Sequence, residues 1–246
     1  MNAPSRETEG IVLRIIDYGE SDRIVGFLTP DMGKISAFAM KARVSRKRFG
    51  GTLDLFHCLA IDLRPPRDPQ GALWRLERVS LVEGYHGLRG DLRRLAAAGY
   101  LADCLWNLLG EGDPHPETYA WWKEALGRLA TQPISVAADL RFELELLSFL
   151  GFAPHWDRCL ECGSESVTGQ VFFSFVRGGV ICSRCPRSGE GRFVEAAWIK
   201  AAQAGDPLPP PAATQLRQVL NSFVCATLGR EPKSQKFREE VFRGEG

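Results

Sequence analysis

Residues 10–40 read GIVLRIIDYGESDRIVGFLTPDMGKISAFAM and contain three short apolar segments separated by turn residues. Segments 10–16, 23–29 and 34–40 are rich in β-branched and apolar side chains, and Ile35, Ala37 and Ala39 alternate along the third. Such alternation is typical of strands that bury one face. The stretch therefore predicts three strands, joined by turns at 17–22 and 29–33.

The next fifty residues continue this pattern. Two further strands are expected at 53–63 and 73–82, separated by the turn-rich segment 64–71, which reads RPPRDPQG. Residues 1–9 are polar and are expected to fray. Five short strands in this space predict a small closed barrel, and the OB-fold is the commonest five-stranded example. An SH3-like barrel is the alternative. We assign residues 1–82 to this N-terminal domain.

From residue 84 onward, apolar residues recur at helical spacing. Helices are expected at 90–109, 117–131, 136–150, 195–204 and 213–228, whereas the tail 230–246 is polar and is given no element. Residues 83–246 therefore form a predicted α-helical domain. The fold class that follows is an α+β multidomain protein, with the barrel first and the helices after it.

A cysteine-rich module interrupts the helices at residues 156–192. It holds two C-x-x-C pairs, CLEC and CSRC, with nineteen residues between them. Two such pairs at this separation fit the four-thiolate zinc template. The predicted ligands of one structural zinc ion per chain are Cys159, Cys162, Cys182 and Cys185. A site closed by four cysteines leaves no position for a substrate, so we expect it to be structural rather than catalytic.

Other interpretations of the cysteines are weaker. Disulfide bonding is the main alternative, and a redox C-x-x-C is disfavoured because no βαβ pattern surrounds either pair. Cys58, Cys104 and Cys225 lie in apolar stretches and are expected to be buried free thiols. A reducing cytoplasm suits both groups of cysteines. We see no secretory leader and no window of about 18 apolar residues that would span a membrane.

The sequence does not contain the catalytic motifs that we sought. Neither a Walker A pattern, nor G-x-S-x-G, nor H-E-x-x-H is present, and the four histidines lie far apart. Glu143 and Glu145 are two apart on a predicted helix and so face different ways. We therefore expect the protein not to be an enzyme.

The distribution of charge is more informative than its total, which is a formal +1. No acidic residue occurs from Met32 to Leu53. Cations that follow a phosphate backbone, beside aromatic rings on which bases stack, are what sequence-tolerant single-strand binding requires. A merely solvated loop is the alternative. The candidate DNA-contacting residues are Lys34, Lys41, Arg43, Arg46, Lys47 and Arg48, with Phe38 and Phe49 as stacking candidates.

Taken together, these features resemble the RecO family of bacterial recombination mediators. The motifs that carry the resemblance are Glu-Gly-Ile-Val-Leu at 9–13, Tyr-Gly-Glu at 18–20, Thr29-Pro30, Gly33-Lys34, Phe-Gly-Gly at 49–51, LELLSFLGFAP at 144–154, the CLECG segment and Gly178-Gly179 before Cys182. They cover nearly the whole chain. The family usually has a glycine where Met40-Lys41-Ala42 stands here.

The resemblance implies an N-terminal OB-fold and a helical domain with a zinc module set within it. It also implies a non-enzymatic role: binding single- and double-stranded DNA, annealing complementary strands and helping to load recombinase. The implied partners are RecR, the single-strand DNA-binding protein and possibly RecF, in a cytoplasmic, nucleoid-associated setting. The rival interpretations are an RNA-binding OB-fold protein, a nuclease with a structural zinc, and a protein–protein adaptor.

Overall fold

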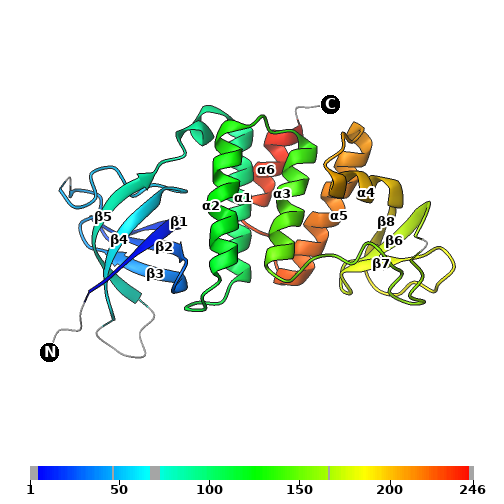
Figure 1. Cartoon of the computed structure of the whole chain (residues 1–246), viewed down its shortest axis with the longest axis horizontal. Coiled ribbons are helices and arrows are strands. Elements are labelled where there is room, and N and C mark those ends of the chain that lie inside the picture. The colour runs from blue at the N-terminus through cyan, green and yellow to red at the C-terminus, as the bar shows by residue number, and fades with distance from the viewer. Residues whose placement is uncertain (1–4, 46, 67–72, 166, 244–246) are drawn as a thin grey trace. The chain divides into compact units, whose positions relative to one another are not determined.

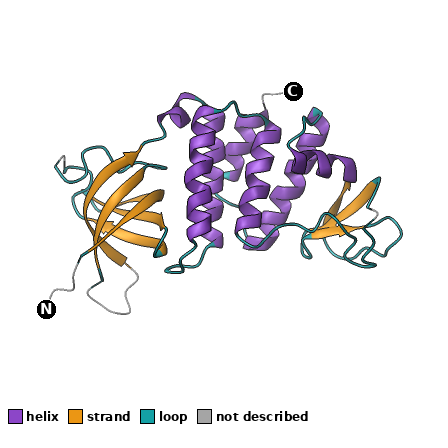
Figure 2. Ribbon diagram, in the orientation of Figure 1, coloured by secondary structure: helices purple, strands orange, loops and turns teal. Residues whose placement is uncertain are grey.

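A computed structural model describes residues 5–45, 47–66, 73–165 and 167–243. The chain divides into two compact units, residues 1–132 and residues 133–246. The first holds a barrel and two long helices, and the second holds four helices and a small sheet (Figures 1 and 2). No helix within the described ranges is both long and apolar enough to cross a bilayer.

The strands of the first unit are β1 (Arg6–Tyr18), β2 (Asp22–Thr29), β3 (Gly33–Ala39), β4 (Cys58–Arg64) and β5 (Leu73–Glu83). They close into a barrel in the order β1-β2-β3-β5-β4, in which only the β3–β5 pair is parallel. This is the Greek-key barrel predicted as an OB-fold. The expectation of an N-terminal five-stranded barrel followed by helices is confirmed.

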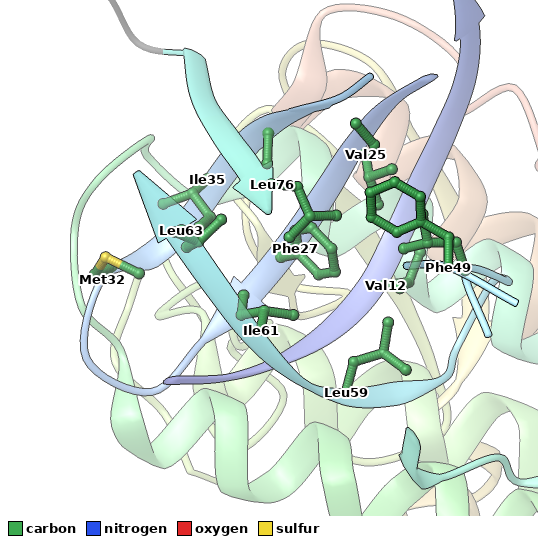
Figure 3. Close-up of a cluster of buried hydrophobic side chains, with 13 residues drawn as sticks. Val12, Val25, Phe27, Met32, Ile35, Phe49, Leu59, Ile61, Leu63 and Leu76 are labelled. Carbon is green, nitrogen blue, oxygen red and sulfur yellow. The ribbon is translucent and has the colours of Figure 1, made fainter. Parts of the chain in front are cut away.

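The barrel is filled by one cluster of buried apolar side chains (Figure 3). Alternate residues of each strand point inward, as in Ile35, Ala37 and Ala39, which are the residues whose alternation predicted β3. Phe27 lies at the centre of the cluster, and Phe49 reaches into it from the connection between β3 and β4. Burial of these side chains is the main source of the barrel's stability.

The strand limits differ from expectation in two places. Residues 6–9, expected to fray, pair with β4, and Arg6 bonds Asp31 through Nη2 at 2.8 Å. Strand β4 begins at Cys58 instead of residue 53, because Phe56 adopts a positive φ of 69° and donates its N–H to the Val12 carbonyl. Residues 67–71 of the predicted turn lie outside the described residues.

Two helices, α1 (Leu92–Leu108) and α2 (Pro116–Thr131), belong to the barrel's unit and follow a short 3₁₀ helix at His86–Gly90. Asp91 caps α1 by accepting the N–H of Arg93. The Trp106 ring of α1 lies so close to Gly26 of β2 that a Cβ there would approach it to 2.2 Å. Helix α1 therefore covers part of the outer face of β2, and it requires glycine at that point.

The second unit begins with α3 (Val136–Phe149), followed by β6 (Gln170–Ser174), β7 (Gly179–Ile181) and β8 (Gly191–Glu195) in a sheet ordered β7-β6-β8. Helices α4 (Ala196–Ala204), α5 (Pro210–Leu228) and α6 (Gln235–Phe242) complete it. Helix α6 lies in the tail 230–246, where no element was predicted. It is short and polar, and its buried face includes Arg238, which carries no apolar signal.

Candidate metal centre and nucleic-acid interface

The four predicted cysteine ligands come together in the second unit. Their sulfur atoms all lie within 4.8 Å of one another, with Cys162 Sγ 3.9 Å and Cys185 Sγ 3.6 Å from Cys182 Sγ. A tetrahedral ion with Zn–S bonds of about 2.3 Å places its sulfurs about 3.8 Å apart. A disulfide needs about 2.05 Å, so the cysteines are not bonded to each other. The cluster could hold a metal ion.

The backbone of each C-x-x-C pair folds as a tight turn around its sulfurs. Gly163 follows the first pair with a φ of 70°, which favours glycine, and its N–H bonds the Cys159 carbonyl at 2.9 Å. In the second pair, the N–H of Cys182 points to Cys159 Sγ at 3.3 Å. Burial works to raise the pKa of Cys159, but the N–H groups of Cys182, Cys162 and Glu161 outweigh it and lower the pKa to about 6. These N–H groups favour the thiolate of Cys159, the form that binds metals.

Few apolar residues pack around the sulfurs. The buried cluster at this end of the module consists, among described residues, of Cys159, Ile181 and Cys182, with three partly buried neighbours. The other end of the module packs on α5, where Phe173 stacks near Trp156 and meets Phe223 edge-on. In the part of the module that the structure describes, the apolar cluster at the cysteine end is small.

The predicted nucleic-acid contacts lie mainly on residues 40–51 of the β3–β4 connection, which we call the basic turn. Three of its cations, Lys41, Arg43 and Lys47, are exposed. The turn is anchored to the β1–β2 hairpin, because Asp22 accepts the N–H of Lys41 at 2.7 Å and the N–H of Arg43 bonds the Ser21 carbonyl at 3.0 Å. The barrel thus holds the backbone of the turn and leaves these three side chains exposed, although Arg43 also donates to the Glu20 carbonyl at 3.2 Å.

Other predicted contacts serve the fold in this structure. Arg48 donates to the Met40 carbonyl at 2.5 Å and lies 4.9 Å from the Phe49 ring centre. Phe49 is 2% exposed within the barrel core, so its ring is not available for stacking, and we withdraw that expectation. Arg46 lies outside the described residues.

Lys34 also departs from expectation. Its Nζ donates to the carbonyls of Trp106 and Leu109 at 2.6 and 2.5 Å, where it satisfies the C-terminal end of α1. Burial lowers the pKa of Lys34, but its two carbonyl partners suit the charged form. A half-buried ammonium with these bonds holds a helix to the barrel, so we withdraw Lys34 from the proposed phosphate contacts.

Phe38 is partly exposed on the outer face of β3 and has a neighbour that sequence reasoning missed. The Tyr18 ring meets the Phe38 ring edge-on, with ring centres 5.9 Å apart. Tyr18 is 56% exposed. Tyr18 falls within the turn predicted at 17–22, whereas in the structure it ends β1, and the pairing of β2 with both β1 and β3 brings it near Phe38.

A polar cluster joins the barrel to α2 and was also missed. Glu9 of β1 accepts bonds from Lys123 Nζ at 2.7 Å and from the Tyr119 hydroxyl at 2.8 Å. Lys123 and then Tyr119 lower the pKa of Glu9, whereas burial raises the pKa of Cys58 beside them. More than a hundred residues separate Glu9 from these partners, so no local pattern could reveal the cluster.

A buried charge network ties together three helices of the second unit. Arg238 of α6 bonds Asp139 through Nε at 2.8 Å and Glu143 through Nη2 at 2.7 Å, both on α3. Arg217 of α5 also bonds Asp139, at 3.2 Å. Glu145, the glutamate considered together with Glu143 in the sequence, is partly exposed and pairs with Arg141. The i and i+4 spacing of Asp139 and Glu143, on one face of α3, was the available signal.

These features define a class: a chain with an OB-like barrel bearing exposed cations, followed by a helical region with a four-cysteine module. Two family models match it. The N-terminal model of recombination protein O matches residues 1–85, and the C-terminal model matches residues 89–236. The chain belongs to the RecO family.

Curated relatives agree over the whole length of the chain. A DNA repair protein RecO from Anaeromyxobacter sp. (strain K) is 39% identical over 243 residues, which cover 94% of this chain and 95% of the relative. Its counterpart from Myxococcus xanthus is 35% identical, with coverage of 96% and 97%. A third, from Rhodopirellula baltica, is 35% identical, with coverage of 92% and 96%. The family match supports a role in DNA repair and recombination.

Proposed function

We propose that this protein is a non-enzymatic recombination mediator that binds single- and double-stranded DNA, anneals complementary strands and helps load recombinase in recombinational repair. Membership of the RecO family supports the role. The observation that carries DNA contact is the basic turn, which presents Lys41, Arg43 and Lys47 to solvent from a rigid OB-fold barrel. Such cations bind phosphates of either form of DNA, because they displace condensed counterions from the backbone.

The basic turn can be tested by removing its charge without removing side-chain length. A Lys41→Gln, Lys47→Gln double variant is titrated with labelled single-stranded DNA at several salt concentrations. Each lost phosphate contact lowers the slope of log affinity against log salt by about 0.7 for single strands. The matched control is Lys200→Gln, an exposed lysine of the second unit. A double variant with the affinity and slope of the control removes the turn from the binding surface.

Annealing requires a separate assay. Two complementary strands, one with a fluorophore and one with a quencher, are mixed at low concentration with the protein. We expect faster quenching with the wild-type protein than without it, and a smaller gain with the double variant, because screened strands approach each other more readily. An unaccelerated reaction under conditions in which both strands are bound contradicts annealing. The same mixtures without partner strands, incubated with Mg²⁺ and Mn²⁺, test for nuclease activity, which we expect to be absent.

The proposed partners are RecR, the single-strand DNA-binding protein and RecF, on the basis of family membership alone. Co-purification with labelled single-stranded DNA and each partner in turn tests them. A complex with RecR that forms without DNA supports direct association. Failure with every partner, alongside normal DNA binding, restricts the function to DNA contact.

We assign zinc to the four-cysteine cluster, as a structural ion and one per chain. The sulfur spacing and the low pKa of Cys159 support a thiolate site of tetrahedral geometry. Metal analysis of freshly purified protein is expected to give a zinc-to-chain ratio near one. A chain that purifies without a stoichiometric metal contradicts the assignment.

DNA, rather than RNA, is the proposed ligand. The proposed location is therefore the cytoplasm, at the nucleoid. Matched DNA and RNA strands of one sequence separate the two ligands, because recognition of RNA commonly uses the 2′-hydroxyl. Tighter binding of RNA favours the RNA-binding interpretation. Binding of neither, with partner binding intact, favours the adaptor.

A further inference from the structure

The outer face of β1, β2 and β3 carries a row of apolar side chains. Along β2 and β3, residues that alternate with the buried Val25 and Ala37 point outward, and these include Ile24 and Phe38. The register pairs Ile16 with Ile24, and Ile24 with Phe38. Three apolar side chains from three strands therefore lie side by side on the outer face.

Tyr18 extends this row at its upper end. Its ring meets Phe38 edge-on at 5.9 Å, although Tyr18 itself pairs with Asp22 in the β1–β2 register. The ring therefore leans across β2 toward β3. With 56% of its surface exposed, it is the most open large aromatic side chain of the described residues. We call Tyr18 and Phe38 the aromatic pair.

Helix α1 covers only part of this sheet face. Trp106 rests on Gly26, two residues along β2 from Ile24, and Arg14 lies over the Trp106 ring at 5.6 Å from its centre. On the other side of Ile24, Tyr18 is exposed and Phe38 is partly exposed. A contiguous exposed apolar patch, unlike a single exposed residue, indicates a binding surface.

The charges around the aromatic pair identify what binds there. Lys41 and Arg43 of the basic turn follow β3 directly, and Arg75 is the register partner of Phe38 on β5. Two of these cations also form ion pairs: Arg43 lies 4.0 Å from Asp17, and Arg75 pairs with Glu77 at 2.8 Å. Asp17 pairs with Arg23 as well, at 3.0 Å, and Asp22 accepts the N–H of Lys41. Glu20 is exposed at the hairpin tip. An apolar aromatic surface bordered by cations matches unpaired bases on a phosphate backbone.

We propose that Tyr18 and Phe38 form a stacking platform for unpaired bases, through which the barrel binds single-stranded DNA more tightly than duplex DNA. The proposal rests on the DNA-binding function proposed above and deepens it. In a duplex the faces of the bases are already stacked, so only the phosphates are available to the basic turn. In a single strand the bases are also available to the rings, and stacking tolerates any sequence because every base has a π-face.

Three ligands of equal length distinguish the platform from the basic turn: an oligo-dT strand, an abasic phosphodiester strand and a duplex. Tyr18→Ala is expected to weaken oligo-dT binding by about 5- to 150-fold, the range of one base–aromatic stack. Binding of the abasic strand and of the duplex stays at the wild-type level, and the salt slope is unchanged because no cation is lost. Tyr18→Phe keeps the ring and is expected to bind oligo-dT as the wild-type protein does.

The matched control for folding is the circular dichroism spectrum and melting temperature of Tyr18→Ala, which are expected to match the wild type because the side chain is exposed. Equal affinity of Tyr18→Ala and wild type for oligo-dT overturns the platform, as does equal weakening on all three ligands. A wild-type protein that binds none of the three ligands contradicts the proposed function itself. Wild-type binding to all three, unaffected by Tyr18→Ala, contradicts the platform alone.

Discussion

The barrel and the cysteine module are both small β structures, but they are stabilised in different ways. The barrel buries thirteen side chains in one apolar cluster, from Val12 to Leu76. At the cysteine end of the module, the corresponding cluster among described residues has three buried members, and two of them are proposed metal ligands. Burial of apolar side chains therefore stabilises the barrel. The two C-x-x-C turns of the module, which we call the knuckles, are expected to depend on the proposed metal ion.

This difference indicates how far each region tolerates change. A barrel held by many apolar contacts loses stability gradually, since each side chain contributes a part of the total. A metal-stabilised turn depends on a single ion whose binding energy is also folding energy. Five variants, apart from their controls, test how each region is stabilised, beginning with the largest expected effect.

Removal of a proposed metal ligand is expected to unfold the knuckles and spare the barrel. Cys159→Ser, or treatment with a strong chelator, removes a contribution of about 10–16 kcal/mol for a structural zinc at neutral pH. Hydrogen exchange resolved by peptide should rise sharply across 159–185 and stay low in β2 and β3. The matched control is Cys225→Ser, at a free thiol that is not a proposed ligand. Unchanged exchange across the knuckles would show that they hold without metal.

Truncation in the barrel core is expected to produce the opposite pattern. Phe27→Ala removes a fully buried ring at the centre of the cluster and should cost about 3–5 kcal/mol. Hydrogen exchange in β2 at increasing urea concentrations measures the lost free energy of unfolding. A chelator should not increase this loss. Val176→Ala, at a side chain 77% exposed, is the control and should change stability little. A chelator that destabilises the barrel as much as the module would end the distinction between the two regions.

The charge network stabilises the second unit at a place away from the four-cysteine cluster. Arg238→Met leaves Asp139 and Glu143 buried without their common partner, and breaking a buried pair in this way costs about 3–5 kcal/mol. The loss should be measured by urea unfolding at neutral pH. Arg243→Met, at the exposed end of α6, is the control.

A second variant separates charge from packing in this network. Adding Asp139→Asn and Glu143→Gln to Arg238→Met removes the stranded negative charges, so part of the lost stability should return. If the triple variant is no more stable than Arg238→Met alone, packing rather than charge determines the effect.

The smallest expected effect concerns pH and Glu9. Its bonds to Lys123 and Tyr119 lower the folded-state pKa of Glu9 below the ordinary value of 4.5. The contribution is therefore present above that value and is lost as the pH falls through the lower folded pKa. Because the Glu9 side chain is 38% exposed, solvent screening keeps the effect small. In Glu9→Gln, the melting temperature should vary less than in the wild type between neutral pH and pH below 4.5.

The sequence predicted the features whose signals are local. Alternation at Ile35, Ala37 and Ala39 predicted a strand, and the cysteine spacing predicted the ligand cluster that the structure assembles. It could not predict that Phe49 would turn inward, because a ring beside a run of cations has the same sequence signal whether it lies inside or outside the barrel. The partners of Lys34 and Arg238 are about seventy to a hundred residues away, and only the folded chain brings them together.

The contact between Trp106 and Gly26 determines where the chain can be cut into stable fragments. Trp106 occupies the space that a side chain would need at Gly26, and Lys34 reaches the same helix end. A fragment that stops at residue 85, where the N-terminal family model ends, would lack Trp106 and expose the surface of β2 at Gly26. It would also leave the ammonium of Lys34 without its carbonyl partners. A fragment ending near residue 132 keeps Trp106 packed on Gly26. A chimera that exchanges the barrel between relatives should therefore include α1 and α2, because the Trp106 ring requires glycine at position 26.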